Sequence, residues 1–158
     1  MIPCTMEQEA VFRYIADTFD GVDVVEADGN AFFFYEPGGE TPPDHRFPFA
    51  TLVANNLYDQ FSNLDREGVF RLNVGVSRQT YEGLFGAKAA RPDTADSAAA
   101  NYDFTALDTI VPHPVYGSMF WVCVLNPSAA TFEAVKPLLA EAYARAVRTR
   151  QGRSADRS

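Results

Sequence analysis

The chain has 158 residues, of which 47% are hydrophobic, and a formal net charge of −8. This length and apolar content suffice for one globular domain whose core needs no metal or disulfide to hold it. Residues 1–144 carry 8 basic and 20 acidic side chains, whereas residues 145–158 carry 5 Arg and one Asp, and an acidic body of this kind argues against a nucleic-acid partner.

The sequence predicts a helix, four strands, a short helix, a further strand and a long helix. Asp28-Gly29 is the clearest local signal, because Asp-Gly supplies the positive φ angles of a two-residue hairpin turn. Residues 69–76 alternate between apolar and polar side chains, as a strand with one buried face does. We expect a helix over about 6–19, strands over 22–26, 31–35, 47–53 and 69–76, a helix over 77–85, a strand over 119–125 and a helix over 137–148.

The short helix after the fourth strand has a clear start. Ser77 is its predicted N-cap, because a serine hydroxyl can accept from the amide two or three residues further on. The apolar residues Tyr81, Leu84 and Phe85 are expected to face the core. Residues 87–101 follow, rich in Ala, Asp and Ser without a large apolar side chain, and predict a mobile surface loop.

The last helix is complicated by a proline. Ser128 or Thr131 can cap it, but Pro137 then falls too late for the first turn. We therefore expect a short turn followed by the main helix over about 137–148. The basic segment 149–158 is expected to be a disordered tail, which leaves a single domain over residues 1–148.

The most apolar run, Met119 to Leu125, predicts a strand that is buried on both faces. Burial of about 200 Å² of the Trp121 indole, at about 25 cal/mol/Å², is enough to explain a tryptophan there. The order of elements predicts an α+β fold: a mainly antiparallel sheet of about five strands, with the N-terminal and C-terminal helices packed on one face.

The cysteines and the N-terminus bear on location. Cys4 and Cys123 lie far apart in sequence, which disfavours a structural disulfide and favours a reducing compartment. The first residues show neither a basic leader nor an apolar run, and no apolar stretch reaches the length of a membrane span. We therefore expect a cytoplasmic protein with no membrane partner.

Polar residues on the alternating strand suggest a binding site. Arg71 and Asn73 share its polar face next to Gly75, and the Arg71 guanidinium needs acceptors, either a carboxylate such as that of Asp65 or an anionic ligand. We expect a binding module for a small molecule or a protein, without a cofactor. The candidate ligand-binding residues are Phe33, Tyr35, His45, Arg46, Arg71, Asn73, His113, Tyr116 and Trp121.

An enzyme is the alternative. His45 and His113 are the only two histidines, and together with Asp44 and Asp108 they could form the site of a metal-assisted or His-dependent hydrolase. Their spacing matches no metal-ligand motif, however, so no metal is predicted and catalytic residues stay unassigned. The sequence also contains no phosphate-binding glycine loop, nucleophile elbow, His-Glu-x-x-His or Cys-x-x-Cys motif.

Four segments carry a family resemblance: RFPFAT at 46–51, LDREGVFRLNVGV at 64–76, PHPVYG at 112–117 and WVCVLNP at 121–127. They resemble a family of short bacterial proteins of unknown function, over most of residues 5–148.

The chain more distantly resembles the MmcQ/YjbR superfamily, in which a helix, an antiparallel sheet, a Trp-bearing strand and a Leu-rich helix follow one another. That resemblance implies the α+β fold, and some members are thought to bind DNA through wing-like elements. This chain departs from the pattern just before Trp121, where Ser118, Met119 and Phe120 replace the Asn and Lys of those members. A homodimer is also compatible with the sequence.

Overall fold

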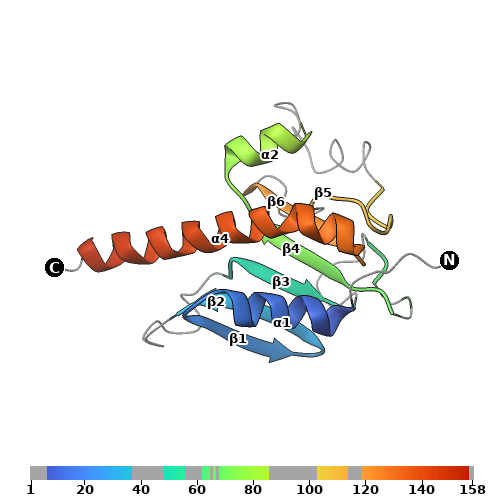
Figure 1. The fold of residues 1–158 in the computed structure, drawn as a ribbon, viewed down its shortest axis with the longest axis horizontal. Coiled ribbons are helices and arrows are strands. Elements are labelled where there is room, and N and C mark those ends of the chain that lie inside the picture. The colour runs from blue at the N-terminus through green and yellow to red at the C-terminus, as the bar shows by residue number, and fades with distance from the viewer. Residues whose placement is uncertain are drawn as a thin grey trace.

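The computed structural model describes residues 7–36, 48–55, 62–64, 66, 68–85, 103–113 and 119–156, with side chains described through residue 149. Within these ranges the chain forms three helices and one six-stranded sheet (Figure 1). The strands are β1 (Val22–Ala27), β2 (Asn30–Tyr35), β3 (Ala50–Val53), β4 (Arg71–Gly75), β5 (Val111–Pro112) and β6 (Trp121–Leu125).

The sheet has the order β1-β2-β3-β4-β6-β5, and every neighbouring pair is antiparallel. The first four strands form a meander, with a tight turn between β1 and β2 and longer connections between β2 and β3 and between β3 and β4. β6 then inserts between β4 and the edge strand β5. The predicted α+β fold is confirmed, with six strands where about five were expected.

The β1–β2 hairpin forms where Asp28-Gly29 predicts it. Asp28 and Gly29 have φ angles of +56° and +81°, the left-handed conformation at both central positions of a type I′ turn. Polar side chains brace the turn from the β3 side: Asn55 donates to the Asp28 carbonyl at 2.8 Å, and Asn30 Oδ1 accepts from the Ala54 amide at 2.8 Å. The hairpin and the end of β3 are thereby held together.

Helices α1 (Gln8–Thr18) and α4 (Ala129–Asp156) cover one face of the sheet, as expected (Figure 1). Their apolar stripes pack on one side of the strands to form the main core. None of the helices in the described ranges has the length and apolar character that a membrane crossing requires. The core includes Val11, Ile15, Phe33, Leu52, Leu72, Val74, Val122, Val124, Val135 and Leu139.

The last helix is longer than predicted. α4 begins at Ala129, where Ser128 Oγ accepts from the Thr131 amide at 3.2 Å, and it continues through Pro137 to Asp156. A proline inside a helix removes one backbone hydrogen bond, and the burial of Leu138 and other core residues beside it offsets that loss. The expected break before residue 137 is wrong, and residues 149–156 of the expected disordered tail are helical.

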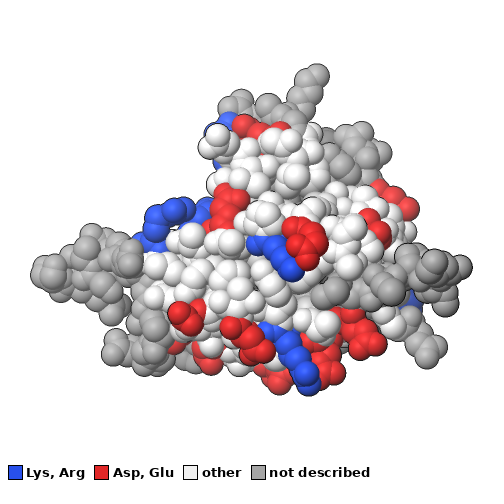
Figure 2. All heavy atoms as spheres, in the orientation of Figure 1, with Lys and Arg blue, Asp and Glu red and all other residues white. Residues whose placement is uncertain are grey.

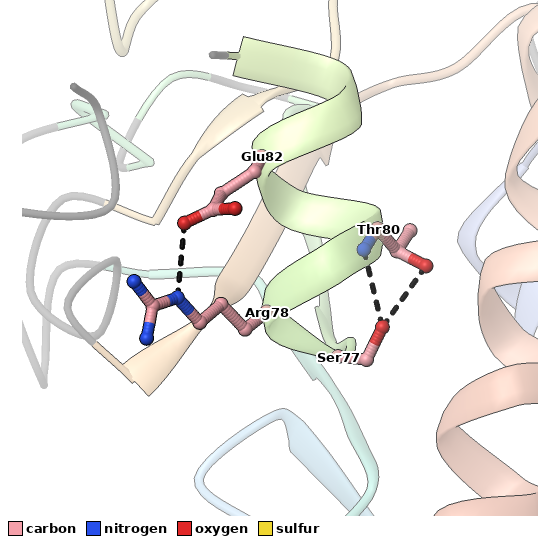
Figure 3. Close-up of polar contacts among 4 residues, drawn as sticks. All are labelled: Ser77, Arg78, Thr80 and Glu82. Atoms are coloured by element: carbon pink, nitrogen blue, oxygen red, sulfur yellow. Dashed lines mark hydrogen bonds and ion pairs between the residues drawn. The ribbon is translucent and has the colours of Figure 1, made fainter. Parts of the chain in front are cut away.

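The short helix α2 (Arg78–Phe85) is capped as predicted. Ser77 Oγ accepts from the Thr80 amide at 3.1 Å. The next residue, Arg78, pairs across one helical turn with Glu82 at 2.9 Å (Figure 3). Tyr81 is buried and contacts the ring of Phe85. Tyr81 and Phe85 lie four residues apart and make the inward stripe. Leu84, expected to face the core, falls beside this stripe and is 43% exposed.

β6 is two residues shorter at its start than the apolar run from Met119 to Leu125. Phe120 has a φ of +66°, outside the strand conformation, so β6 begins at Trp121, and Met119 is 60% exposed. Trp121 pairs with Gly75 across β4 and β6, and its indole covers that glycine. A Cβ built on Gly75 would lie 2.9 Å from Trp121 Cε2. Gly75 therefore makes room for the indole.

We expect Gly75→Ala to lower the free energy of unfolding by about 1–3 kcal/mol, because the added methyl group forces the indole out of its position. Gly83→Ala is the matched control: it lies inside α2, a Cβ there meets nothing within 4 Å, and alanine should stabilise the helix by about 0.5–1 kcal/mol. Urea unfolding monitored by Trp121 fluorescence measures both. Equal effects of the two substitutions would contradict the packing argument.

Glu141 ties α4 to the start of α2. Its Oε1 accepts from the Ser77 amide at 3.1 Å and from Thr80 Oγ1 at 3.0 Å. Arg145, one turn along α4, donates to the Val76 carbonyl just before this junction. Burial raises the pKa of Glu141, but the hydrogen bonds from Ser77 and Thr80 and the charge of Arg145 outweigh burial and hold the pKa below its ordinary value.

Glu141→Gln should lower the free energy of unfolding by about 1 kcal/mol at pH 7. A depressed pKa gives stability that is present above the unfolded-state value, about 4.3 for Glu, and is lost as the pH falls through the folded-state value. The difference between wild type and variant should therefore shrink below about pH 4, as measured by urea unfolding across pH. Glu82→Gln, in an exposed pair, should change stability by less than about 0.5 kcal/mol. A pH-independent loss in Glu141→Gln would contradict this account.

Candidate functional site

The face of the sheet opposite α1 and α4 carries polar side chains at its centre. Residues directly opposite each other on antiparallel strands point to the same face. Leu72 and Val74 belong to the helix-side core, so the alternate residues of β4, Arg71 and Asn73, point to the other face. One continuous row of paired residues on that face is Val25, Phe32, Thr51, Asn73, Cys123 and Val111.

Arg71 is the largest buried side chain of the described structure that carries a charge, and the residue is only 1% exposed. Its Nη1 donates to Ser62 Oγ at 3.0 Å, and its Nη2 lies 3.5 Å from His113 Nε2. Ser62 and His113 are themselves buried. We call the five buried residues Thr51, Ser62, Arg71, Asn73 and His113 the polar cluster.

The contact between Arg71 Nη2 and His113 Nε2 depends on the histidine tautomer. A guanidinium has donors only, so the contact is a hydrogen bond in the tautomer that carries its ring proton on Nδ1. The His113 amide donates to the Trp121 carbonyl at 2.9 Å, extending the β5–β6 pairing by one residue. The imidazole is thus positioned by the sheet, at the end of β5.

Asn73 occupies the middle of the polar face and is 2% exposed. Its Nδ2 donates to Thr51 Oγ1 at 2.9 Å on the neighbouring strand β3. Its Oδ1 is buried and has no hydrogen-bond partner in the described part of the chain. A buried acceptor without a donor costs about 1–3 kcal/mol, so the position of Asn73 is a feature that needs an explanation.

Two segments outside the strands close over this face. Arg66 joins them: its Nη2 donates to the Ser62 carbonyl at 3.1 Å and to the Thr105 carbonyl at 3.0 Å. Leu64 packs with Val53 and Leu125 below it. The guanidinium of Arg66 therefore keeps Ser62 in place over Arg71.

The cysteine of this face has a structural environment. Cys123 is buried with Phe104 and Val111, and its thiol donates to the Pro112 carbonyl at 3.8 Å. A buried thiol that donates to a backbone carbonyl is a small core side chain rather than an activated nucleophile.

Asp108 serves the start of the last helix. Its carboxylate accepts from the Ser128 amide at 2.7 Å, and its own amide donates to the Leu125 carbonyl at 2.7 Å. The hydrogen bonds from Ser128 and Thr131 hold the pKa of Asp108 below its ordinary value. No group of three or more His, Cys, Asp or Glu side chains suited to a metal ion occurs among the described residues.

The structure brings some of the predicted site residues together and separates others. Arg71, Asn73 and His113 lie on one face, with Trp121 at its edge over Gly75. Phe33 and Tyr35 point to the helix face instead, where Phe33 contacts Phe12 with ring centroids 5.5 Å apart and Tyr35 contacts Tyr143 at 5.5 Å. The sheet therefore stands between Phe33 and Tyr35 on one side and the other three residues on the other, so the two groups do not line one site.

Other predicted residues lie outside the described ranges. These are His45, Arg46 and Tyr116 of the candidate site, Asp44 of the alternative metal site, and Asp65, the carboxylate suggested as a partner of Arg71.

Sequence reasoning missed two members of the polar cluster. Thr51 is the one polar residue of β3, whose sequence is ATLV, so a polar side chain in an apolar strand was a detectable signal. Ser62 comes from a polar segment with no periodicity, and only the three-dimensional structure brings it to Arg71.

Comparison with known proteins gives a family without an activity. A model of a family of unknown function, DUF6194, matches residues 6–155, which include every helix and strand described above apart from the last residue of α4. No curated protein and no solved structure matches the chain. Because the match spans nearly the whole sequence, the chain belongs to the family of unknown function DUF6194.

Proposed function

We propose that this protein is a binding module for a small anionic molecule, whose anionic group is bound by Arg71 within the polar cluster. The observation that carries the proposal is the burial of a permanently charged guanidinium, 1% exposed, on the same face of the sheet as the buried Asn73 Oδ1, which has no hydrogen-bond partner in the described part of the chain. Coulomb attraction at about 4 Å is several-fold stronger in a protein interior than in water. The planar guanidinium also matches the geometry of a carboxylate or a phosphate.

The position of Arg71 supports the proposal. β4 is an interior strand, flanked by β3 and β6, and its backbone is held by pairing on both sides. Groups on such a strand are fixed before a ligand arrives, so binding does not have to pay for ordering them. Asn73, Ser62 and Thr51 add hydroxyl and amide groups that can orient a ligand.

The hydrolase alternative has less support among the described residues. His113 Nε2 faces the Arg71 guanidinium, which competes with a role as a general base at that nitrogen. The neighbouring Cys123 thiol is buried against a carbonyl. We therefore favour binding without chemistry.

We also propose that the fold is related to the MmcQ/YjbR superfamily, on the order of a first helix, an antiparallel sheet, a Trp-bearing strand and a long last helix. DNA binding is not part of this proposal. On the face drawn in Figure 2, acidic side chains gather over α1 and β1, where phosphate would be repelled. A cytoplasmic location stays part of the proposal, supported by the buried free thiol of Cys123.

We expect small anions to raise the melting temperature of the protein at constant ionic strength. A ligand at 100 times its dissociation constant should shift the melting temperature by about 5–10 °C. Arg71→Lys keeps the charge but loses the planar fork, and should weaken this response about tenfold. Arg78→Met removes an exposed arginine and should leave it unchanged. The proposal fails if no carboxylate or phosphate stabilises the wild type, or if Arg71→Lys responds as the wild type does.

The protein should pass through a heparin column without retention at about 0.15 M ionic strength, because its acidic body outweighs its basic C-terminal segment. Retention that falls steeply with added salt would contradict this expectation. Substitution of Arg145 and Arg148 by Gln would then show whether α4 is responsible.

A further inference from the structure

We propose that the outer edge of β1 binds an extended basic segment of a partner protein, which adds a strand to the sheet. The segment pairs antiparallel with β1 and carries a Lys or Arg opposite Glu26 and apolar side chains opposite Val24 and Val22. This inference stands on β1 and is independent of the anion site at Arg71.

The backbone of β1 has hydrogen-bonding groups along its outer edge. β1 is the first strand of the sheet, and within the described part of the chain it pairs with β2 alone. The Glu36 amide donates to the Gly21 carbonyl at 2.8 Å, so Gly21 and every second residue after it bond toward β2. The amides and carbonyls of Val22, Val24 and Glu26 therefore point away from β2 and can pair with another strand.

The two edges of the sheet differ in how they are protected. The opposite edge strand, β5, has two residues and ends in Pro112, which has no amide hydrogen to donate. β1 has six residues, an unbroken register with β2, and neither proline nor lysine. Short length, proline, lysine and bulges commonly protect an edge strand, and β1 has none of them. Such an edge is suited to the addition of a strand.

Charge selects the kind of strand that can be added. Residues 14–45 contain eight Asp and Glu and no Lys or Arg. Acidic side chains gather over α1 and β1 on the face drawn in Figure 2, and Glu26 and Asp28 at the end of β1 are exposed. A second copy of this edge would bring like charges together, whereas a basic segment is attracted to it. The partner is therefore a basic segment rather than another copy of this chain.

The side chains of β1 set the pattern of the segment. Val22 and Val24 are half-buried and pack against the main core, so apolar side chains opposite them would extend that core. Glu26 lies on the same face, because it is two residues beyond Val24. An antiparallel partner, read from its N-terminus, thus has a basic residue, an apolar residue two positions later and another apolar residue two positions after that.

The probe is a fluorescein-labelled peptide, Lys-Thr-Lys-Thr-Val-Thr-Val-Thr, whose second Lys aligns with Glu26. Fluorescence anisotropy should show saturable binding that becomes about tenfold weaker when both Lys are replaced by Glu. N-methylation of the first Val, which aligns with Val24, removes a donor to β1 and should also weaken binding about tenfold. N-methylation of the Thr before it alters an amide that points away from β1 and should have little effect.

Glu26→Lys tests the charge on the protein side. The residue is exposed, so the variant should fold as the wild type does, and it should prefer the peptide that contains Glu. Glu82→Lys is the matched control. It makes the same change of net charge on α2, away from β1 (Figure 1), and should keep the preference for the Lys peptide.

Three outcomes would overturn the inference. The first is the absence of binding by the wild type at about 1 mM peptide. The second is equal affinity for the Lys and Glu peptides, or equal effects of the two N-methylations. The third is a concentration-dependent dimer, measured by sedimentation, that is lost in Val24→Pro, which removes an outward amide of β1. A second copy would then occupy the edge. None of these outcomes bears on the anion site.

Discussion

The two-residue period of β4 is the constraint on which the rest of the structure depends. Leu72 and Val74 enter the core beneath α1 and α4, and this forces Arg71, Asn73 and Gly75 onto the opposite face. A register slip of one residue would exchange the two sets and place a guanidinium in the main core. The apolar packing under the helices therefore fixes the position of the polar cluster.

The polar face of the sheet is covered by irregular segments, whereas the opposite face is covered by helices. A helix stripe supplies apolar contacts but few donors or acceptors, whereas the segments around Ser62 and Thr105 supply hydroxyl and backbone carbonyl groups. Arg66 holds these segments together through carbonyl groups and is half-buried, whereas Arg71 is buried. Two arginines five residues apart thus differ in role: Arg66 connects two segments, and Arg71 is a buried charge.

The sequence predicts those parts of the fold whose causes are local. The turn at Asp28 depends on two φ angles, and the cap at Ser77 depends on an amide three residues away, so both could be recognised in advance. The continuity of α4 through Pro137 could not, because packing against the sheet offsets a local penalty.

The candidate site was only partly predictable for the same physical reason. Alternation along β4 identifies Arg71 and Asn73, since the period of a strand is visible in the sequence. Whether Tyr35 points to the same face as Arg71 and Asn73 depends on long-range pairing through β3. That pairing places Tyr35 on the helix side of the sheet. Ser62 reaches Arg71 through a loop whose path no periodicity encodes.

The face that holds Arg71 and Asn73 is unusual because polar side chains occupy buried positions of an interior strand. Apolar side chains at these two positions would fill an interior strand at no cost in desolvation, since replacing buried ionic or polar groups by apolar ones of similar volume is often neutral or stabilising. Gly75, the next residue on this face, has no side chain at all and makes room for the Trp121 indole. Along β4 this face thus carries a cation and an amide where two apolar side chains would fit, next to a glycine that is covered by an aromatic ring. Stability alone does not require a cation and an amide at these two positions, and this is the reason for proposing that they recognise a polar ligand.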